Sequence, residues 1–178
     1  MYHTYSRLAN LLGVLSLAVA DQMTEAMTGV ADQGGGAPAA LVQIADHPRL
    51  TIEELRRRIG LSHSATVRLI DRLAARGLIL RDRSQQDARA AGLRLTRQGE
   101  AAARAVLAAR GQVTASIVGR LPPDRQRELE SLLDEMLARI PATSEDGTLL
   151  CRLCCLRDCP ADRCPVELRY QELLRQGR

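Results

Sequence analysis

One segment of the chain, "LTIEELRRRIGLSHSATVRLIDRLAARGLI" at residues 50–79, constrains the fold most because it predicts two short helices joined by a tight turn. Thr51 is positioned to cap the first helix, and Gly60 is positioned to end it. Ser62 can cap the second helix, which Gly77 would end. Two helices joined by a short glycine-containing turn form a helix-turn-helix motif.

A pair of short strands is predicted directly after this motif. Residues 78–83, "LILRDR", are apolar in a strand-like way, and residues 93–99, "LRLTRQG", alternate apolar and polar side chains. The polar segment "SQQDARAAG" separates them. A helix-turn-helix followed by a hairpin is a winged helix, so we expect a mainly α fold with a small β-hairpin wing.

Helices are predicted on both sides of the winged helix. Residues 5–27 carry apolar side chains at helical spacing, an alanine-rich helix is expected over 100–118, and Pro122 and Pro123 open a further helix. The broad apolar stripe of that helix, which reaches Ile140, needs a partner, either the N-terminal helix or a second subunit. We expect an N-terminal dimerisation helix and loop in 1–36, a winged helix in 37–98, C-terminal dimerisation helices in 99–141, and a cysteine-rich segment in 142–178 that begins with a flexible linker, "PATSEDGT".

Basic charge is concentrated in the predicted winged helix. All 25 basic residues are Arg, and residues 49–97 carry a net charge of +7 although the whole chain carries +4. This distribution is typical of a protein that binds the phosphate backbone, while a solvated basic surface is the alternative. The chain has no Trp or Phe, which argues against a single-strand binder that stacks bases on aromatic rings.

From about Ser6 to Ile140 the sequence resembles the MarR family of bacterial transcriptional regulators. The resemblance rests on "GLSHSATVRLIDRLAARGLILR", on "DAR" at residues 87–89 and on "LRLTRQG". It implies a homodimer with intertwined N- and C-terminal helices that binds a pseudo-palindromic double-stranded DNA operator. It also implies that a small-molecule effector could bind between the dimerisation helices and the DNA-binding domain.

The resemblance assigns DNA contacts to two groups of residues. The recognition helix would begin with Ser62, His63, Ser64, Thr66, Val67 and Arg68, whose side chains would approach base edges in the major groove. In the wing, Arg89 would enter the minor groove, Asp87 would orient the hairpin, and Arg81 and Arg83 would contact backbone phosphates. Ala88 stands where the family often has a further Arg. Exposed residues without a role are the alternative for His63 and Arg89.

All five cysteines lie in "CRLCCLRDCPADRCPVE". Without Cys155, the spacing is Cys151-x2-Cys154-x4-Cys159-x4-Cys164, which offers four thiolates either to zinc or to an iron–sulfur cluster. Cys155 is then a spare or alternate ligand. A thiol–disulfide sensor and a structural segment are the alternatives. We expect this segment to modulate DNA affinity.

An enzyme is not expected. His3, His47 and His63 are the three histidines, none lies beside a cysteine in the sequence, and there is no glycine-rich phosphate loop. A cysteine-dependent electron-transfer enzyme is therefore the weakest alternative. The apolar run "LANLLGVLSLAVA" is too short to span a bilayer, and the N-terminus lacks the features of a secretory signal, so we expect a cytoplasmic protein without a membrane partner.

Overall fold

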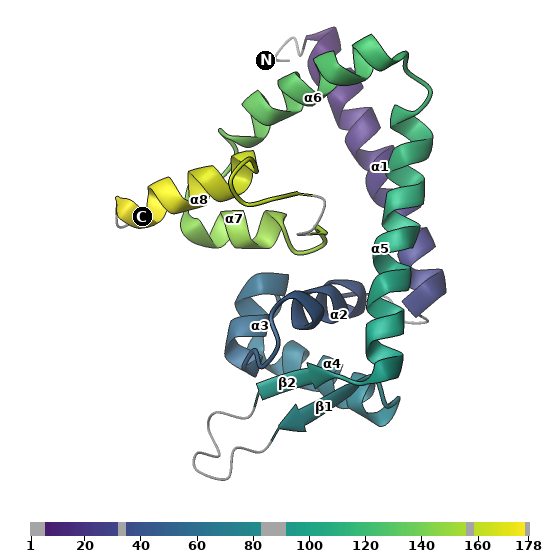
Figure 1. Ribbon diagram of the computed structural model, residues 1–178, viewed down its shortest axis with the longest axis vertical. Helices are drawn as coiled ribbons and strands as arrows, with labels where there is room; N and C mark the ends of the chain where they lie inside the picture. Colours follow the sequence, from purple (N-terminus) through teal and green to yellow (C-terminus); the bar gives the residue numbers. More distant parts are fainter. Residues whose placement is uncertain (1–5, 32–34, 83–91, 156–158, 177–178) are drawn as a thin grey trace, which may run out of the picture.

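The computed structural model describes residues 6–31, 35–82, 92–155 and 159–176. The elements are α1 (Arg7–Ala31), α2 (Ala37–Asp46), α3 (Ile52–Ile59), α4 (His63–Ala75), β1 (Ile79–Asp82), β2 (Gly92–Leu95), α5 (Arg97–Val118), α6 (Pro123–Leu137), α7 (Ser144–Leu150) and α8 (Pro165–Arg175). Figure 1 shows three parts: the winged helix at the bottom, the long helices α1, α5 and α6 above it, and α7 with α8 beside them. The described elements confirm the mainly α fold with a small hairpin.

The winged helix forms where the capping residues predict it. The Thr51 hydroxyl accepts a hydrogen bond from the backbone N–H of Glu54, and the Glu54 carboxylate accepts one from the backbone N–H of Thr51, which makes a reciprocal capping box. Gly60 ends α3 with φ of 68°, a conformation that favours glycine. Ser62 caps α4 by accepting a hydrogen bond from the backbone N–H of Ala65.

Strands β1 and β2 form an antiparallel hairpin in which Ile79 pairs with Leu95 and Asp82 with Gly92. An isolated bridge between Leu50 and Leu93 adds a third short segment to the sheet. The hairpin and the three helices enclose one core, whose largest fully buried side chains include Leu41, Ile44, Leu55, Leu69, Ile70, Leu73, Ile79 and Leu93. This core fixes the orientation of α4 relative to the wing.

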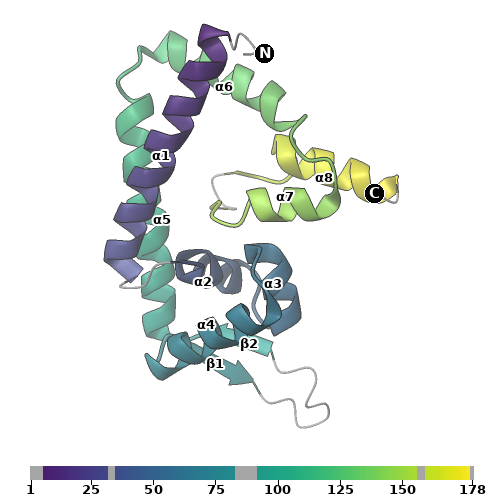
Figure 2. The same cartoon turned by 180° about the vertical axis from the view of Figure 1, so that it is seen from behind.

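The long helices α1 and α5 lie side by side (Figures 1 and 2). Met27 and Val106 form a small core with Val42 of α2, which attaches the pair to the winged helix. Much of the remaining apolar surface is uncovered in the single chain: Leu8, Leu11, Leu12, Val14, Leu15 and Leu17 of α1 are exposed, and so are Leu132, Leu133 and Met136 of α6. Helix α6, all of which is described, has no buried side chain.

The expected flexible linker is wrong, because "PATSEDGT" contains most of α7. Thr143 caps this helix and forms a capping box with Asp146. Gly147 packs against Val166 and Tyr170 of α8, so the two short helices support each other. Helix α7 also contacts α3 of the winged helix, and α8 contacts α6. The cysteine-rich segment is therefore packed between the winged helix and the long helices.

In the described part of the chain, no helix is long and apolar enough to cross a membrane.

Candidate functional site

The N-terminal half of α4 presents a polar face to solvent. Ser62, His63, Ser64 and Arg68 are exposed and Val67 is partly exposed, while the opposite face of the helix is buried in the core. Nδ1 of His63 lies 3.7 Å from a carboxylate oxygen of Glu53 in α3. These five side chains lie at the start of a helix on the surface, an arrangement that can contact the major groove.

Thr66 is the exception among the expected base-contacting residues. Its side chain is fully buried, and its hydroxyl donates a hydrogen bond to the carbonyl oxygen of Ser62, 2.9 Å away. It shares the buried face of α4 with Leu69, Ile70 and Leu73. Thr66 therefore supports the start of the helix and cannot reach a base edge in this arrangement, which corrects the expectation for this residue.

Arg72 belongs to the same surface although the motif did not assign it a contact. It lies one helical turn after Arg68, and both side chains are exposed. Residues four positions apart share a helix face, so the spacing itself could have identified Arg72.

The base of the wing is held by ion pairs. Arg81 in β1 donates to Asp71 of α4 at 2.5 Å. Arg94 in β2 lies 2.7 Å from Asp82, with Arg49 at 3.9 Å from the same carboxylate. The expected contacts of Arg83, Asp87 and Arg89 lie outside the described residues.

The four cysteines singled out by spacing line one small cavity, named here the thiol pocket. Its lining consists of Cys151, Cys154, Cys159, Ala161, Cys164 and Glu167, and its volume is about 140 Å³. Local structure positions two of the thiols: Cys151 is the C-terminal cap of α7, and Cys164 is the N-terminal cap of α8. The thiol pocket thus includes the C-terminal end of α7 and the N-terminal end of α8, two helices that pack together.

The thiols of this pocket interact in two pairs. A hydrogen bond with Cys151 lowers the pKa of Cys154 to about 6, assisted by the positive charge of Arg110 in α5. The same hydrogen bond, with burial, raises the pKa of Cys151 above its ordinary value. Burial and a hydrogen bond with Cys164 raise the pKa of Cys159 to about 11. One thiol of the first pair is therefore the preferred thiolate.

The donor set suits a thiolate-bound metal. Four soft sulfur ligands around a small cavity match zinc or an iron–sulfur cluster. As the side chains stand, no group of three or more His, Cys, Asp and Glu residues in the described ranges is arranged to hold a metal ion. Closing such a site would require the two thiol pairs to move towards each other.

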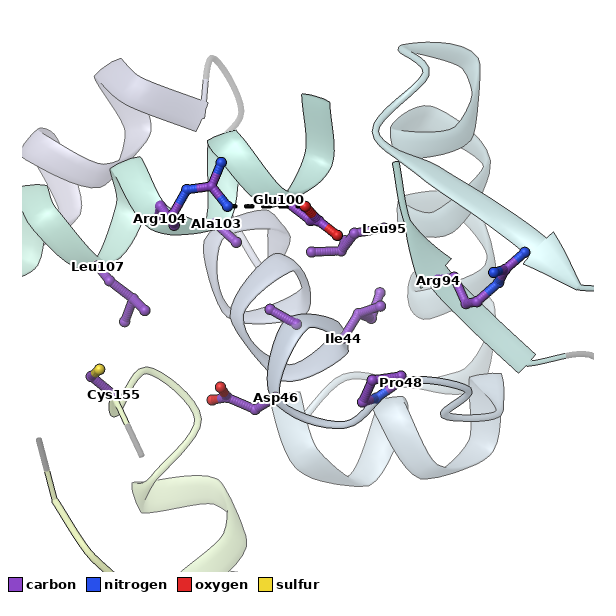
Figure 3. Close-up of a pocket in the computed structure, with 11 residues that line it drawn as sticks. Ile44, Asp46, Pro48, Arg94, Leu95, Glu100, Ala103, Arg104, Leu107 and Cys155 are labelled. Carbon is purple, nitrogen blue, oxygen red and sulfur yellow. Dashed lines mark ion pairs between the residues drawn. The ribbon is translucent and has the colours of Figure 1, made fainter. Parts of the chain in front are cut away.

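Cys155 lies outside the thiol pocket and lines a second pocket of about 420 Å³ (Figure 3). This pocket lies between the end of α2, strand β2 and α5, and its lining is mixed. Leu107, Leu95 and Ile44 supply apolar surface, while Asp46, Arg94, Glu100 and Arg104 supply charge. Cys154 and Cys155 are therefore adjacent in the sequence but line different cavities.

A protein-family model matches the segment that contains most of the winged helix. The model of the MarR family matches residues 33–90, which include α2, α3, α4 and β1. A comparison with curated proteins finds no match.

Solved structures share the fold over about three quarters of the chain. MepR from Staphylococcus aureus, a transcription regulator of the multidrug efflux pump MepA, is 16% identical with a TM-score of 0.67, covering 77% of this chain and 100% of MepR. YusO from Bacillus subtilis is 23% identical with a TM-score of 0.66, covering 74% and 93% of the two chains.

The MarR family protein Rv2887 from Mycobacterium tuberculosis is similar in two complexes. Its complex with DNA is 20% identical with a TM-score of 0.60, covering 74% of this chain and 98% of that one. Its complex with salicylic acid is 22% identical with a TM-score of 0.58, covering 75% and 98%. These identities establish a shared fold, and about a quarter of this chain has no counterpart in each match.

Proposed function

We propose that the chain is a winged-helix DNA-binding transcriptional regulator of the MarR family, and that it acts as a homodimer whose DNA affinity depends on a metal or cluster in the thiol pocket. Members of this family are regulators rather than enzymes. The observation that carries the regulatory half is the convergence of Cys151, Cys154, Cys159 and Cys164 on one cavity beside a winged helix.

Duplex DNA is supported as the partner by the exposed start of α4 and by the charge of its surroundings. Residues 49–97 carry a net charge of +7, and Arg68 and Arg72 extend the exposed face of the recognition helix. Phosphate contacts of this kind make affinity fall steeply with salt. In a gel-shift experiment on the promoter of its own gene, Arg68→Ala should weaken binding, whereas Arg175→Ala on α8 should not. Failure of the wild-type protein to prefer this fragment over random duplex, with or without metal, would refute the regulator proposal.

Homodimerisation is supported by the apolar surfaces of α1 and α6. Exposed leucines such as Leu11 and Leu132 recur along these helices, and contiguous apolar surface of this kind marks a protein interface. A two-fold dimer would place two recognition helices on the two halves of a pseudo-palindromic operator.

A thiolate-bound metal in the thiol pocket is supported by the number and type of the donors that line this cavity. Zinc and an iron–sulfur cluster use the same four ligands, and they differ in colour. Anaerobically purified protein should contain either one zinc per chain and be colourless, or iron and sulfide and be brown. Cys154→Ser should reduce this content, whereas Cys155→Ser should leave it unchanged. Metal-free wild-type protein with five titratable thiols would refute this proposal.

Disulfide chemistry is the alternative for the same pocket. Cys151, Cys154, Cys159 and Cys164 line one cavity, and the pKa shifts couple Cys151 with Cys154 and Cys159 with Cys164. With hydrogen peroxide as oxidant, each pair would lose two protons and two electrons to form a disulfide, and the peroxide would be reduced to two waters. Peptide mass spectrometry after peroxide treatment would find these two pairings if this alternative holds.

The 420 Å³ pocket supports a further proposal, a small-molecule effector. Its size falls in the range of ligand sites, and its lining combines Leu95 and Leu107 with Arg94 and Arg104. Because Rv2887 has been crystallised with salicylic acid, salicylate is a suitable probe. Salicylate should raise the melting temperature of the wild-type protein and have a smaller effect on Arg104→Ala. No shift in the wild type would count against salicylate as a ligand.

A further inference from the structure

The segment that carries the thiol pocket lies directly against the helix-turn-helix. Figures 1 and 2 both place α7 above α2 and α3, and α7 contacts α3. In the sequence this segment follows the predicted C-terminal dimerisation helices and is far from the winged helix. In the structure it contacts α3, so a change at the thiols can reach the recognition helix of the same chain through α7 and α3.

The contact centres on Leu149 of α7 and Gly60, the residue that ends α3. A Cβ atom added to Gly60 would lie 2.9 Å from Cδ1 of Leu149, so the leucine side chain covers the glycine closely. Gly60 is followed by Leu61 and then by Ser62, the cap of α4. Leu149 therefore packs on the turn that sets where the recognition helix begins.

The other end of this route is the thiol pocket. Helix α7 ends at Leu150 and is capped by Cys151, whose backbone N–H donates to the carbonyl oxygen of Gly147 at 3.3 Å. Arg152 donates from its side chain to the carbonyl oxygen of Leu149 at 2.7 Å. Any displacement of Cys151 thus acts on the last turn of α7, which carries Leu149.

A second attachment holds the segment to α2. The side chain of Gln43 is buried, its Nε2 donates to the carbonyl oxygen of Arg152 at 3.3 Å, and its Oε1 accepts from Arg58 of α3 at 3.3 Å. Leu153 packs against both apolar cores. Because residues 152 and 153 are anchored, we expect motion at Cys151 to be passed towards Leu149 rather than absorbed by the loop.

We infer that Leu149 is a positioning residue that transmits the ligation state of the thiol pocket to the helix-turn-helix turn of its own chain. This inference rests on the proposed function. Drawing the four thiols together around a metal would move Cys151 and, with it, the last turn of α7. The packing of Leu149 on Gly60 would then change. The position of α4 in the major groove would change with it, without a change in the dimer interface.

The test compares the DNA affinity of anaerobically purified protein with that of the same protein after treatment with EDTA and dithiothreitol. The measured quantity is the ratio of the two Kd values for the promoter duplex. We expect a ratio of about tenfold in the wild type, within the usual range of allosteric coupling. Leu149→Ala should reduce the ratio to about twofold or less while the metal content stays the same.

Two control variants test whether the effect comes from the contact between Leu149 and Gly60. Leu150→Ala removes the neighbouring leucine, which is 39% exposed, and should keep the wild-type ratio. Leu149→Met restores bulk against Gly60 and should recover the ratio. If Leu149→Ala fails to fold, Leu149→Val replaces it.

A failure of the coupling through Leu149 can be distinguished from a failure of the proposed function of the thiol pocket. The coupling through Leu149 would be overturned if Leu149→Ala or Leu149→Val kept both the metal content and the Kd ratio of the wild-type protein. If the wild-type protein itself had a Kd ratio of one, the proposed function on which the coupling rests would be overturned instead.

Discussion

Arg81, in the first strand of the wing, is hydrogen-bonded to Asp71 of the recognition helix at 2.5 Å. Both side chains are substantially exposed, at 41% and 57%. An exposed pair of this kind contributes at most about 1 kcal/mol to stability. The pair joins β1 to α4 and neutralises one of the basic side chains expected to meet DNA phosphates.

Asp71→Asn should tighten DNA binding. The substitution removes a negative charge from the exposed face of α4 and releases Arg81 for a phosphate. We expect the dependence of log Kd on log salt to become steeper by about one unit, with a change in unfolding free energy below about 0.5 kcal/mol. Fluorescence anisotropy over a salt series measures this. Glu130→Gln on α6 provides a charge-matched control, and equal salt slopes for the two variants would contradict the prediction.

Thr66→Val should reduce stability without changing base preference. Valine keeps the shape of the buried side chain but loses the hydrogen bond to the Ser62 carbonyl, which costs about 1 kcal/mol. Ser64→Ala, at an exposed neighbouring position, should weaken operator binding with little effect on stability. Denaturant unfolding and binding to single-base operator variants separate the two effects. A changed base preference of Thr66→Val at unchanged stability would contradict this prediction.

Gly60→Ala should destabilise the protein by about 1–2 kcal/mol, the cost of placing alanine in a left-handed conformation. The new methyl group would also lie 2.9 Å from Leu149. In a Leu149→Ala background the loss should therefore be smaller, which a double-mutant cycle of unfolding free energies would detect.

Gly111→Ala is the matched control for this substitution. Gly111 lies within α5 and its added Cβ would meet no atom within 4 Å, so alanine should be neutral or stabilising there. Equal effects at the two glycines would contradict the assigned role of the Gly60 turn.

Leu132→Glu should weaken the homodimer. Leu132 of α6 and Leu168 of α8 are both 52% exposed in the single chain, but only Leu132 belongs to the apolar surface assigned to the dimer. Sedimentation at micromolar concentration should find monomer for Leu132→Glu and dimer for Leu168→Glu. A dimer in both variants would place the interface elsewhere.

The helix-turn-helix could be predicted because its signals are local. The caps at Thr51 and Ser62 and the stop at Gly60 act within a few residues of their positions, and the structure has helices at those bounds. Helical spacing also predicts the burial of Thr66, because it shares one face of α4 with Leu69, Ile70 and Leu73. The resemblance to the family instead assigns it a base contact.

Helix α7 was not predicted because its composition resembles a linker. Its seven residues are stabilised by distant partners such as Val166 and Tyr170, which pack around Gly147. The contact between Leu149 and Gly60 likewise joins segments far apart in the chain. Spacing grouped the four cysteines that line the thiol pocket, and their role as ligands stays a prediction.

Control of DNA affinity by the thiol pocket can be tested directly. The most direct measurement is the Kd for the promoter duplex under anaerobic conditions, before and after chelation, for the wild type, Cys154→Ser and Cys155→Ser. The Kd of the wild type and of Cys155→Ser should change about tenfold on chelation, while the Kd of Cys154→Ser should not change and should equal the chelated value. One Kd shared by all three proteins in both states would contradict it.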